Sequence, residues 1–193
     1  MLADRLKNEG LKVMQIREPG GTTLSETIRD VLLDPGYRID PFAEMLLFSA
    51  ARSQLVSESI IPALKEDTVV ICDRFFDSTI AYQGAGRGVA DEAWLMDFQL
   101  HVTGQLQPAR TYLIEVPTEV ALARRSDRTE DRMEASGAEL QKRVAHAYSE
   151  LARLYPERIC TIDGRDDPAA IHRKIWEDLC EQPHIDLKPS ERR

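Results

Sequence analysis

The stretch Val69–Gly88 constrains the fold of this chain more than any other. It opens with four apolar residues, three of them β-branched, which is the pattern of a short strand buried on both faces of a parallel sheet. The run ends abruptly at Asp73 and Arg74, where the strand should emerge. Ligands of open parallel sheets bind at the carboxyl ends of strands, so this charged pair is placed to meet one. A core strand with a salt-bridged end explains the same residues, and the stretch alone favours neither interpretation.

Strands alternate with helices along the rest of the chain. Apolar runs predict strands at residues 11–16, 110–116 and 158–162. Helical patterns cover residues 23–32, 41–65, 91–102, 138–154 and 168–179. This alternation predicts an α/β fold, in which helices cover both faces of a parallel sheet. We expect a single domain over residues 1–181, followed by a polar, flexible tail at 182–193.

A turn with two glycines follows the first of these strands. Arg17, Glu18 and Pro19 precede Gly20 and Gly21. Proline cannot donate to a ladder, and paired glycines allow the backbone to turn sharply and to approach a ligand closely. An ordinary strand–turn–helix connection accounts for the glycines, but it leaves the charged pair Arg17-Glu18 unexplained.

Phe48 and Arg52 are four residues apart and therefore share one face of the helix predicted at residues 41–65. In isolation, Phe48 is more often a core residue and Arg52 a solvated one. An aromatic ring with an arginine one turn later is also an arrangement that stacks a base and holds an anion. Both interpretations stay open at this point.

Charge density rises sharply after the strand at 110–116. Arg124, Arg128 and Arg132 fall on one helical face, among acidic residues. A solvated helix with ion pairs along its surface fits this composition. The sharper hypothesis is a mobile, arginine-bearing lid over a phosphate site, at about residues 124–137.

Net charge and cysteine spacing narrow the class of protein. The net charge of −8 argues against a nucleic-acid or membrane-surface binder. No apolar run approaches the roughly 20 residues that a membrane-spanning helix needs. Cys72, Cys160 and Cys180 are far apart and lack the spacing of a metal site, so we expect reduced, buried thiols in a cytoplasmic protein.

Four motifs together resemble those of the bacterial thymidylate kinases. They are REPGGT at residues 17–22, FSAAR at 48–52, DRFFDSTIAYQGAGRG at 73–88 and DRME at 131–134, in that family's order and spacing. The resemblance implies a parallel sheet of the P-loop NTPase type, as in nucleoside monophosphate kinases. It also implies transfer of the γ-phosphoryl group of Mg-ATP to dTMP, and a homodimer packed through the helices at 41–65 and 91–102.

The resemblance assigns catalytic roles to four charged residues. Arg74 would bind the phosphate of dTMP and neutralise charge during transfer. Asp73 would lie near the phosphates and near Mg²⁺, which it could reach through water, but no residue is assigned as a certain metal ligand. Arg124 and Arg128 would close over ATP. A phosphoryl group in transfer spreads charge over its oxygens, so cationic clamps fit this chemistry.

The resemblance also assigns the residues that bind dTMP. They are Glu18, Pro19, Arg29, Phe48, Arg52, Arg74, Thr79 and Gln83. Phe48 would stack on thymine, and Arg52 would bind a carbonyl of the ring. Thr79 and Gln83 would contact the edge of the base, while Glu18 and Arg29 would flank the sugar and the phosphate.

This sequence departs from the family pattern in one respect. It contains no Gly-Lys dipeptide and hence no GxxxxGK(S/T) phosphate loop, which in this family follows a first strand in the middle of the sheet. We therefore expect the natural protein to begin upstream of Met1, and two strands here to lack a ladder partner. Two alternatives stay open: a kinase for another nucleoside monophosphate, and a non-catalytic nucleotide-binding or dimerisation protein.

Overall fold

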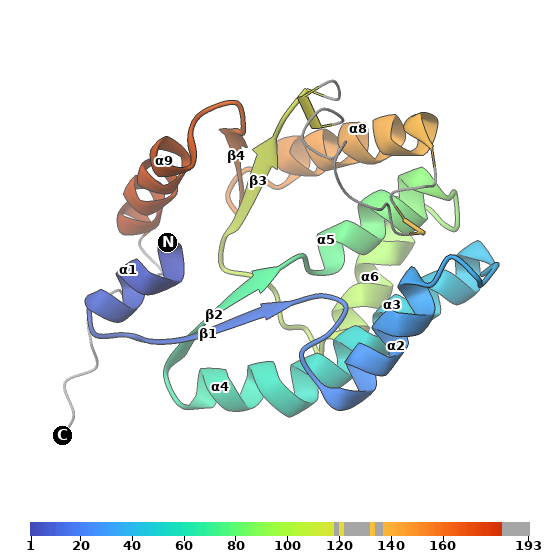
Figure 1. Ribbon diagram of the computed structural model, residues 1–193, viewed down its shortest axis with the longest axis horizontal. Coiled ribbons are helices and arrows are strands. Elements are labelled where there is room, and N and C mark those ends of the chain that lie inside the picture. Colours follow the sequence, from blue (N-terminus) through green and yellow to red (C-terminus); the bar gives the residue numbers. More distant parts are fainter. Residues whose placement is uncertain (118–119, 122–131, 134–136, 183–193) are drawn as a thin grey trace.

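The computed structural model describes residues 1–117, 120–121, 132–133 and 137–182 (Figure 1). The strands are β1 (Lys12–Arg17), β2 (Thr68–Asp73), β3 (Thr111–Glu115) and β4 (Ile159–Asp163). The helices are α1 (Leu2–Asn8), α2 (Thr23–Leu33), α3 (Pro41–Leu55), α4 (Ile61–Lys65), α5 (Phe76–Thr79), α6 (Glu92–Val102), α8 (Ala138–Leu154) and α9 (Pro168–Glu181), with π-helical stretches η1 (Val56–Ile60) and η2 (Ile80–Gly86). Every strand and helix predicted within the described residues is present, which confirms the α/β fold, whereas a helix predicted to start at residues 117–119 falls largely outside them.

The strands pair in parallel, as predicted. β1 lies beside β2, with Lys12 opposite Thr68 and Arg17 opposite Asp73. β3 lies beside β4 in the same manner. Parallel pairing brings the carboxyl ends of β1 and β2, together with the loops that follow them, to one edge of the sheet.

The described strands form two two-stranded sheets rather than one continuous sheet. A cavity of about 1420 Å³ is lined by all of β2 and by residues 111–113 of β3. Among the described strands, β2 pairs only with β1 and β3 only with β4, in agreement with the expectation that two strands lack a ladder partner. The predicted burial of Val69–Cys72 on both faces is wrong: these residues are half-buried, because they line the cavity.

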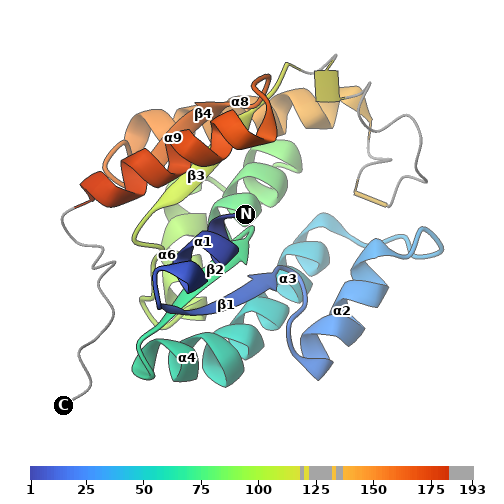
Figure 2. The same ribbon diagram turned by 60° about the vertical axis from the view of Figure 1, so that its left-hand side comes forward.

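Helices surround the strands. Figure 2 shows α8 and α9 on the side of β3 and β4, whereas α2, α3 and α4 lie on the side of β1 and β2. The short α1 packs near α9, with the guanidinium of Arg5 4.2 Å from the ring centre of Trp176. No helix of the described residues is long and apolar enough to cross a membrane.

Polar side chains begin four of the helices. Thr22 Oγ1 accepts a hydrogen bond from the backbone N–H of Ser25 at the start of α2, at 3.1 Å. Asp40, Asp91 and Asp167 accept backbone N–H groups in the same way at the starts of α3, α6 and α9. Such caps satisfy N–H groups that the first helical turn leaves without a partner.

α3 and α4 form one long helix that the π-helical stretch η1 interrupts. The N–H of Ile61 donates to the carbonyl of Val56, five residues earlier. Pro62 follows at once and has no N–H, so the regular hydrogen-bond ladder cannot continue through this turn. The helix is as long as the sequence pattern predicts, and it carries both Phe48 and Arg52.

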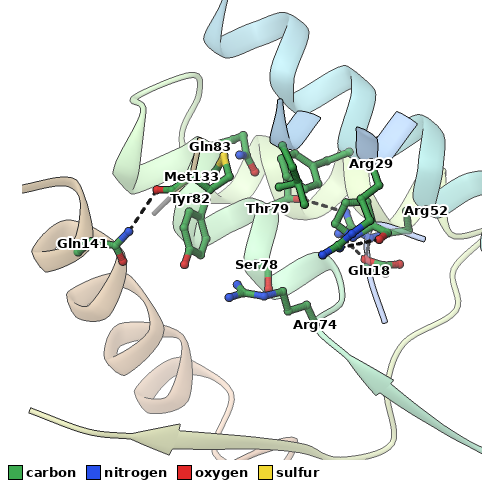
Figure 3. A pocket seen from close by; sticks show the side chains of 13 residues that line it. Glu18, Arg29, Arg52, Arg74, Ser78, Thr79, Tyr82, Gln83, Met133 and Gln141 are labelled. Atoms are coloured by element: carbon green, nitrogen blue, oxygen red, sulfur yellow. Dashed lines mark hydrogen bonds and ion pairs between the residues drawn. The ribbon is translucent and has the colours of Figure 1, made fainter. Parts of the chain in front are cut away.

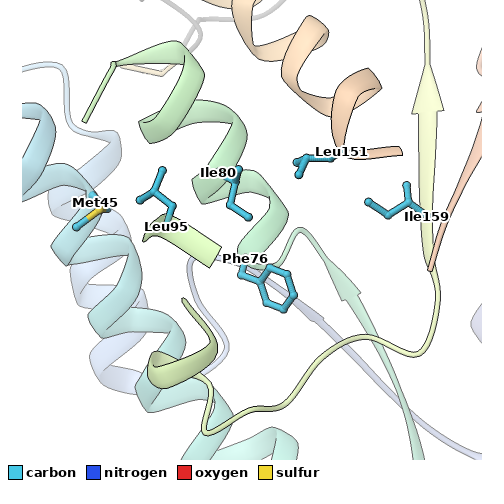
Figure 4. Close-up of a cluster of buried hydrophobic side chains, with 6 residues drawn as sticks. All are labelled: Met45, Phe76, Ile80, Leu95, Leu151 and Ile159. Carbon is cyan, nitrogen blue, oxygen red and sulfur yellow. The ribbon is translucent and has the colours of Figure 1, made fainter. Parts of the chain in front are cut away.

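A cluster of buried apolar side chains holds α5 and η2 in place. Its members come from α3, α5, η2, α6, α8 and β4: Met45, Phe76, Ile80, Leu95, Leu151 and Ile159 (Figure 4). Each is at most 6% exposed. Burying one such side chain contributes about 1.5–3 kcal/mol. The segment that follows β2 is therefore fixed against three helices before it reaches the site.

Candidate functional site

One cavity of about 150 Å³ brings together all eight residues that the resemblance assigns to dTMP (Figure 3). They come from the loop after β1, from α2 and α3, and from the segment after β2. Five further residues complete the lining: Leu33, Ser78, Tyr82, Met133 and Gln141. The cavity meets the larger one between the sheets, because Arg74, Ser78 and Tyr82 line both.

The two loops of the site leave neighbouring strands at the same edge. The backbone N–H of Glu18 donates to the carbonyl of Asp73 at 2.9 Å, which extends the β1–β2 pairing by one residue. The Glu18–Pro19 peptide bond is cis. Arg74 has a φ of 68°, a left-handed conformation that costs a non-glycine residue about 1–3 kcal/mol. Backbone strain of this kind is concentrated at functional sites, where surrounding structure holds it in place.

Arg52 is the most heavily bonded side chain of the cavity. It is 2% exposed, and its Nε and Nη2 contact Glu18 Oε2 at 2.8 and 2.6 Å. Its Nη1 donates to Thr79 Oγ1 at 2.8 Å and to Gln99 Oε1 at 2.6 Å. Gln99 in turn donates to Ser49 Oγ. This network fixes the guanidinium rigidly, so the solvated alternative for Arg52 is wrong.

Glu18 has one carboxylate oxygen paired and one unpaired. Oε2 accepts a hydrogen bond from Arg52, whereas Oε1 is buried without a hydrogen-bond partner among the described residues. Burial raises the pKa of Glu18, against the opposing effect of the Arg52 guanidinium. A buried acceptor without a donor is costly, and a hydroxyl group of a ligand in the cavity would satisfy it.

Arg74 lies beside Tyr82 at the junction of the two cavities. Its guanidinium carbon is 5.4 Å from the ring centre of Tyr82. Tyr148 donates to Ser78 Oγ at 2.7 Å, and burial raises the pKa of Tyr148 to about 12, so this phenol stays a neutral donor. Arg29 lines the same smaller cavity and donates to the carbonyl of Pro19 at 3.0 Å. The cavity lining therefore includes two guanidinium groups, whose charge suits an anion.

Gly20 and Gly21 allow the loop after β1 to pass close to its neighbours. Gly21 has a φ of 87°, and a Cβ built there would lie 2.7 Å from Leu55 Cδ1. The N–H of Gly21 donates to Glu26 Oε1 at 2.8 Å. The sequence interpretation of a sharp, close turn therefore holds, and Arg17, which it left unexplained, pairs with Glu26 at 3.1 Å.

Comparison with known proteins identifies the family. A family model described as thymidylate kinase matches residues 1–175. The chain belongs to the thymidylate kinase family. The thymidylate kinase of Prosthecochloris aestuarii is 43% identical over 189 residues, which cover 93% of this chain and 84% of that protein. The thymidylate kinase of Pseudomonas fluorescens is 45% identical over 176 residues, covering 90% of this chain and 83% of that protein.

A solved member of the thymidylate kinase family has the same fold. The crystal structure of thymidylate kinase from Ehrlichia chaffeensis superposes with a TM-score of 0.68 at 30% identity, over 87% of this chain and 80% of that chain. This similarity shows the predicted fold, in which helices cover parallel strands as in nucleoside monophosphate kinases.

The four residues predicted to be catalytic fall into two groups in this thymidylate kinase family member. Arg74 lines both cavities, and Asp73 lines the larger one beside it. Arg124 and Arg128 lie outside the described residues. Of the predicted lid, the structure describes only residues 132–133 and 137. The lid and its two arginines stay predictions.

Sequence reasoning did not place five residues that line the cavity. Ser78 and Tyr82 follow β2 at helical spacing with Thr79 and Gln83, but the resemblance assigned them no role. Met133 lies in the DRME motif, also without an assigned role, and Leu33 carried no signal. Gln141 lies on α8, and its side-chain amide donates to the carbonyl of Met133 at 3.4 Å. Only the tertiary fold brings α8 to the site.

Proposed function

We propose that the cavity binds dTMP and that the chain transfers the γ-phosphoryl group of ATP to it, forming dTDP. Membership of the thymidylate kinase family makes this chain a nucleoside monophosphate kinase, a phosphotransferase. The observation that carries the proposal is the convergence on one cavity of seven motif residues and Arg29, with Arg74 at its junction with a second cavity. Transfer between two nucleotides needs such a junction, because the acceptor and donor phosphates must meet.

The base would lie between Phe48 and the polar groups of the segment after β2. Contacts within the described residues account for four of the five N–H groups of Arg52. The fifth is then available to a carbonyl of thymine. Phe48 lines the same cavity and offers a ring on which a base can stack, an interaction of about 1–3 kcal/mol.

The sugar and phosphate would occupy the charged end of the cavity. The unpaired Oε1 of Glu18 would accept a sugar hydroxyl. Arg29 and Arg74 would hold the phosphate, with Arg74 also neutralising the charge that develops during transfer. These three residues come from α2 and from the loops after β1 and β2, so binding one nucleotide uses groups from three segments.

Asp73 fits a role beside Mg²⁺ that arrives with ATP. It is exposed at the end of β2 and lines the larger cavity together with Arg74. The described residues hold no group of three His, Cys, Asp or Glu that could bind a metal by itself. Mg²⁺ in nucleotide sites usually takes one or two carboxylates plus phosphate oxygens, so a single carboxylate suffices. The bound ion would offset the negative charge of the phosphates.

The function is tested by following dTDP formation from dTMP and Mg-ATP, with dUMP, dCMP and AMP as alternative acceptors. We expect dTMP to be preferred. Arg74→Ala should lower kcat/KM by about 10²-fold or more, because it removes a charge that acts in transfer. Arg153→Ala, which removes a surface pair with Glu150, should leave kcat/KM unchanged. Faster phosphorylation of another nucleoside monophosphate would refute the assignment of dTMP as the substrate.

A second candidate is nucleotide binding without transfer, which the residues that line the smaller cavity would support by themselves. The same assay separates the two when it includes a version of the chain extended upstream with a strand and the GxxxxGK(S/T) loop of the family. Activity of the extended version alone would favour the family reaction. Binding of dTMP without transfer by either version would favour the second candidate.

We also propose a cytoplasmic homodimer. The three cysteines are free, as expected in a reducing compartment, but their predicted burial is wrong: Cys72 and Cys160 are half-buried and Cys180 is exposed. Phe42 and Leu46 on α3 and Trp94 on α6 are 48%, 43% and 44% exposed, on the helices where the family resemblance expects the dimer contact. Light scattering should give twice the chain mass, and Phe42→Glu should give a monomer. Leu154→Glu, at a site 46% exposed on α8, is the control that should leave the dimer intact.

A further inference from the structure

Glu44 is a buried acid that does not line the cavity but touches residues that do. It lies in the first turn of α3 and is 1% exposed. Gln83 Nε2 donates to Glu44 Oε1 at 2.9 Å, and the guanidinium of Arg87 contacts both carboxylate oxygens at 3.3 Å. Arg132 Nη1 lies 2.6 Å from Glu44 Oε2. One carboxylate therefore joins α3, η2 and the chain at residue 132.

The two arginines fix the chemistry of this carboxylate. Both carboxylate oxygens of Glu44 lie within hydrogen-bond distance of guanidinium N–H groups, which can only donate, so both oxygens serve as acceptors. Gln83, itself 1% exposed, must then turn its NH₂ group toward Glu44. The carbonyl oxygen lies on the other branch of the same planar amide. Glu44 thus fixes the orientation of the side-chain amide of Gln83.

Glu44 also holds part of the cavity rim. Arg132, which it binds, donates from Nε to the carbonyl of Leu32 at 2.6 Å, and its backbone N–H donates to the carbonyl of Leu33 at 3.4 Å. The residue after it, Met133, lines the cavity together with Leu33. The orientation of the amide and the position of the rim therefore depend on a single buried acid.

We propose that Glu44 is a positioning residue that turns the carbonyl oxygen of Gln83 toward the nucleotide, and so selects pyrimidines that carry N–H at ring position 3. This inference rests on the proposed function. Thymine and uracil present a donor at that position, whereas cytosine presents an acceptor. When the fixed carbonyl oxygen of Gln83 faces the acceptor of cytosine, two buried polar atoms stay unpaired. The affinity for dCMP should therefore be roughly tenfold to a hundredfold lower than the affinity for dTMP.

The test measures binding of dTMP, dUMP and dCMP by calorimetry, first with the unaltered chain. We expect dTMP and dUMP to bind and dCMP to bind at least tenfold more weakly. This comparison needs no variant, so it stands even where a substitution impairs folding. Equal affinity for dTMP and dCMP would overturn the inference. Failure to bind any of the three would overturn the proposed function together with it.

Glu44→Gln then tests the role of the acid itself. The new amide can donate as well as accept, so Gln83 becomes free to turn over, and the preference for dTMP over dCMP should fall by about tenfold. Glu44→Asp, which keeps a carboxylate, should retain more of the preference than Glu44→Gln. Asp178→Asn makes the same acid-to-amide change at the Arg110 ion pair, away from the cavity, and should leave the preference unchanged.

A purely structural role for Glu44 predicts a different pattern. Loss of stability alone would weaken the binding of all three nucleotides equally and leave the ratio of their affinities unchanged. An unchanged ratio of dTMP to dCMP affinity in Glu44→Gln, beside a clear preference in the unaltered chain, would refute the positioning role while leaving the proposed function intact.

Discussion

Replacing Arg52 by methionine should destabilise the protein more than any exposed charge substitution. Arg52→Met removes both contacts to Glu18 and leaves that carboxylate, 5% exposed, without a counter-charge among the described residues. Removing one partner of a buried ion pair costs about 3–5 kcal/mol. Thr79 and Gln99 also lose a donor. Against a total stability of about 5–15 kcal/mol, the loss should lower Tm by roughly 6–20 °C.

The loss should also depend on pH. Burial raises the pKa of Glu18 above its unfolded value, and removing Arg52 raises it further. A carboxyl whose folded pKa is raised contributes stability at low pH, and this contribution is lost as pH rises through the folded pKa. The deficit of Arg52→Met relative to the unaltered chain should therefore be larger at pH 8 than at pH 5.

Urea unfolding at both pH values measures the effect. Arg17→Met is the matched control, because Arg17 pairs with Glu26 with side chains 52% and 41% exposed, and such pairs contribute about 0–1 kcal/mol. The double variant Glu18→Gln/Arg52→Met should recover part of the loss. If Arg52→Met were no less stable than Arg17→Met, the buried pair would not hold the site together.

Three further outcomes follow from the structure. Gly21→Ala should lower the free energy of unfolding in urea by about 2–4 kcal/mol, because it combines a positive φ with a steric clash. Gly88→Ala should lower it by about 1–2 kcal/mol, because Gly88 has a φ of 71° but lies in open space among the described residues. Phe76→Ala, in the buried cluster, should cost about 3–5 kcal/mol, and Tyr37→Ala, at a site 54% exposed, less than about 0.5 kcal/mol. Binding of dTMP should release protons, because a hydroxyl donated to Glu18 Oε1 favours the ionised acid, so affinity should rise with pH. Calorimetry in two buffers of different ionisation enthalpy measures that release, which Glu18→Gln should reduce to the part that comes from the phosphate of dTMP.

The arrangement of the loops at the site could be predicted because it depends on short-range patterns. The apolar runs of β1 and β2 end at Arg17 and Asp73, and parallel pairing places those ends together. The spacing of Phe48 and Arg52 placed both on one helical face. The partners of these residues could not be predicted, since Glu18 and Arg52 meet across 34 positions of the chain.

Burial was harder to predict than secondary structure. Val69–Cys72 have the composition of a doubly buried strand, yet they line a cavity, because burial depends on what lies beside the strand. Glu44 lies in an apolar helical stretch, and its spacing alone does not predict a functional role. Its significance comes from Gln83 and two arginines that lie far from it in the sequence.

The most direct test of the account is whether Phe48 and its neighbours bind the base of dTMP. Calorimetric titration of the unaltered chain should show saturable binding of one dTMP per chain. Phe48→Ala should weaken it by roughly fivefold to a hundredfold, the size of a stacking interaction, while the exposed-site variant Tyr37→Ala should bind as the unaltered chain does. Equal affinity of the Phe48→Ala and Tyr37→Ala variants for dTMP would contradict the placement of the nucleotide in this cavity.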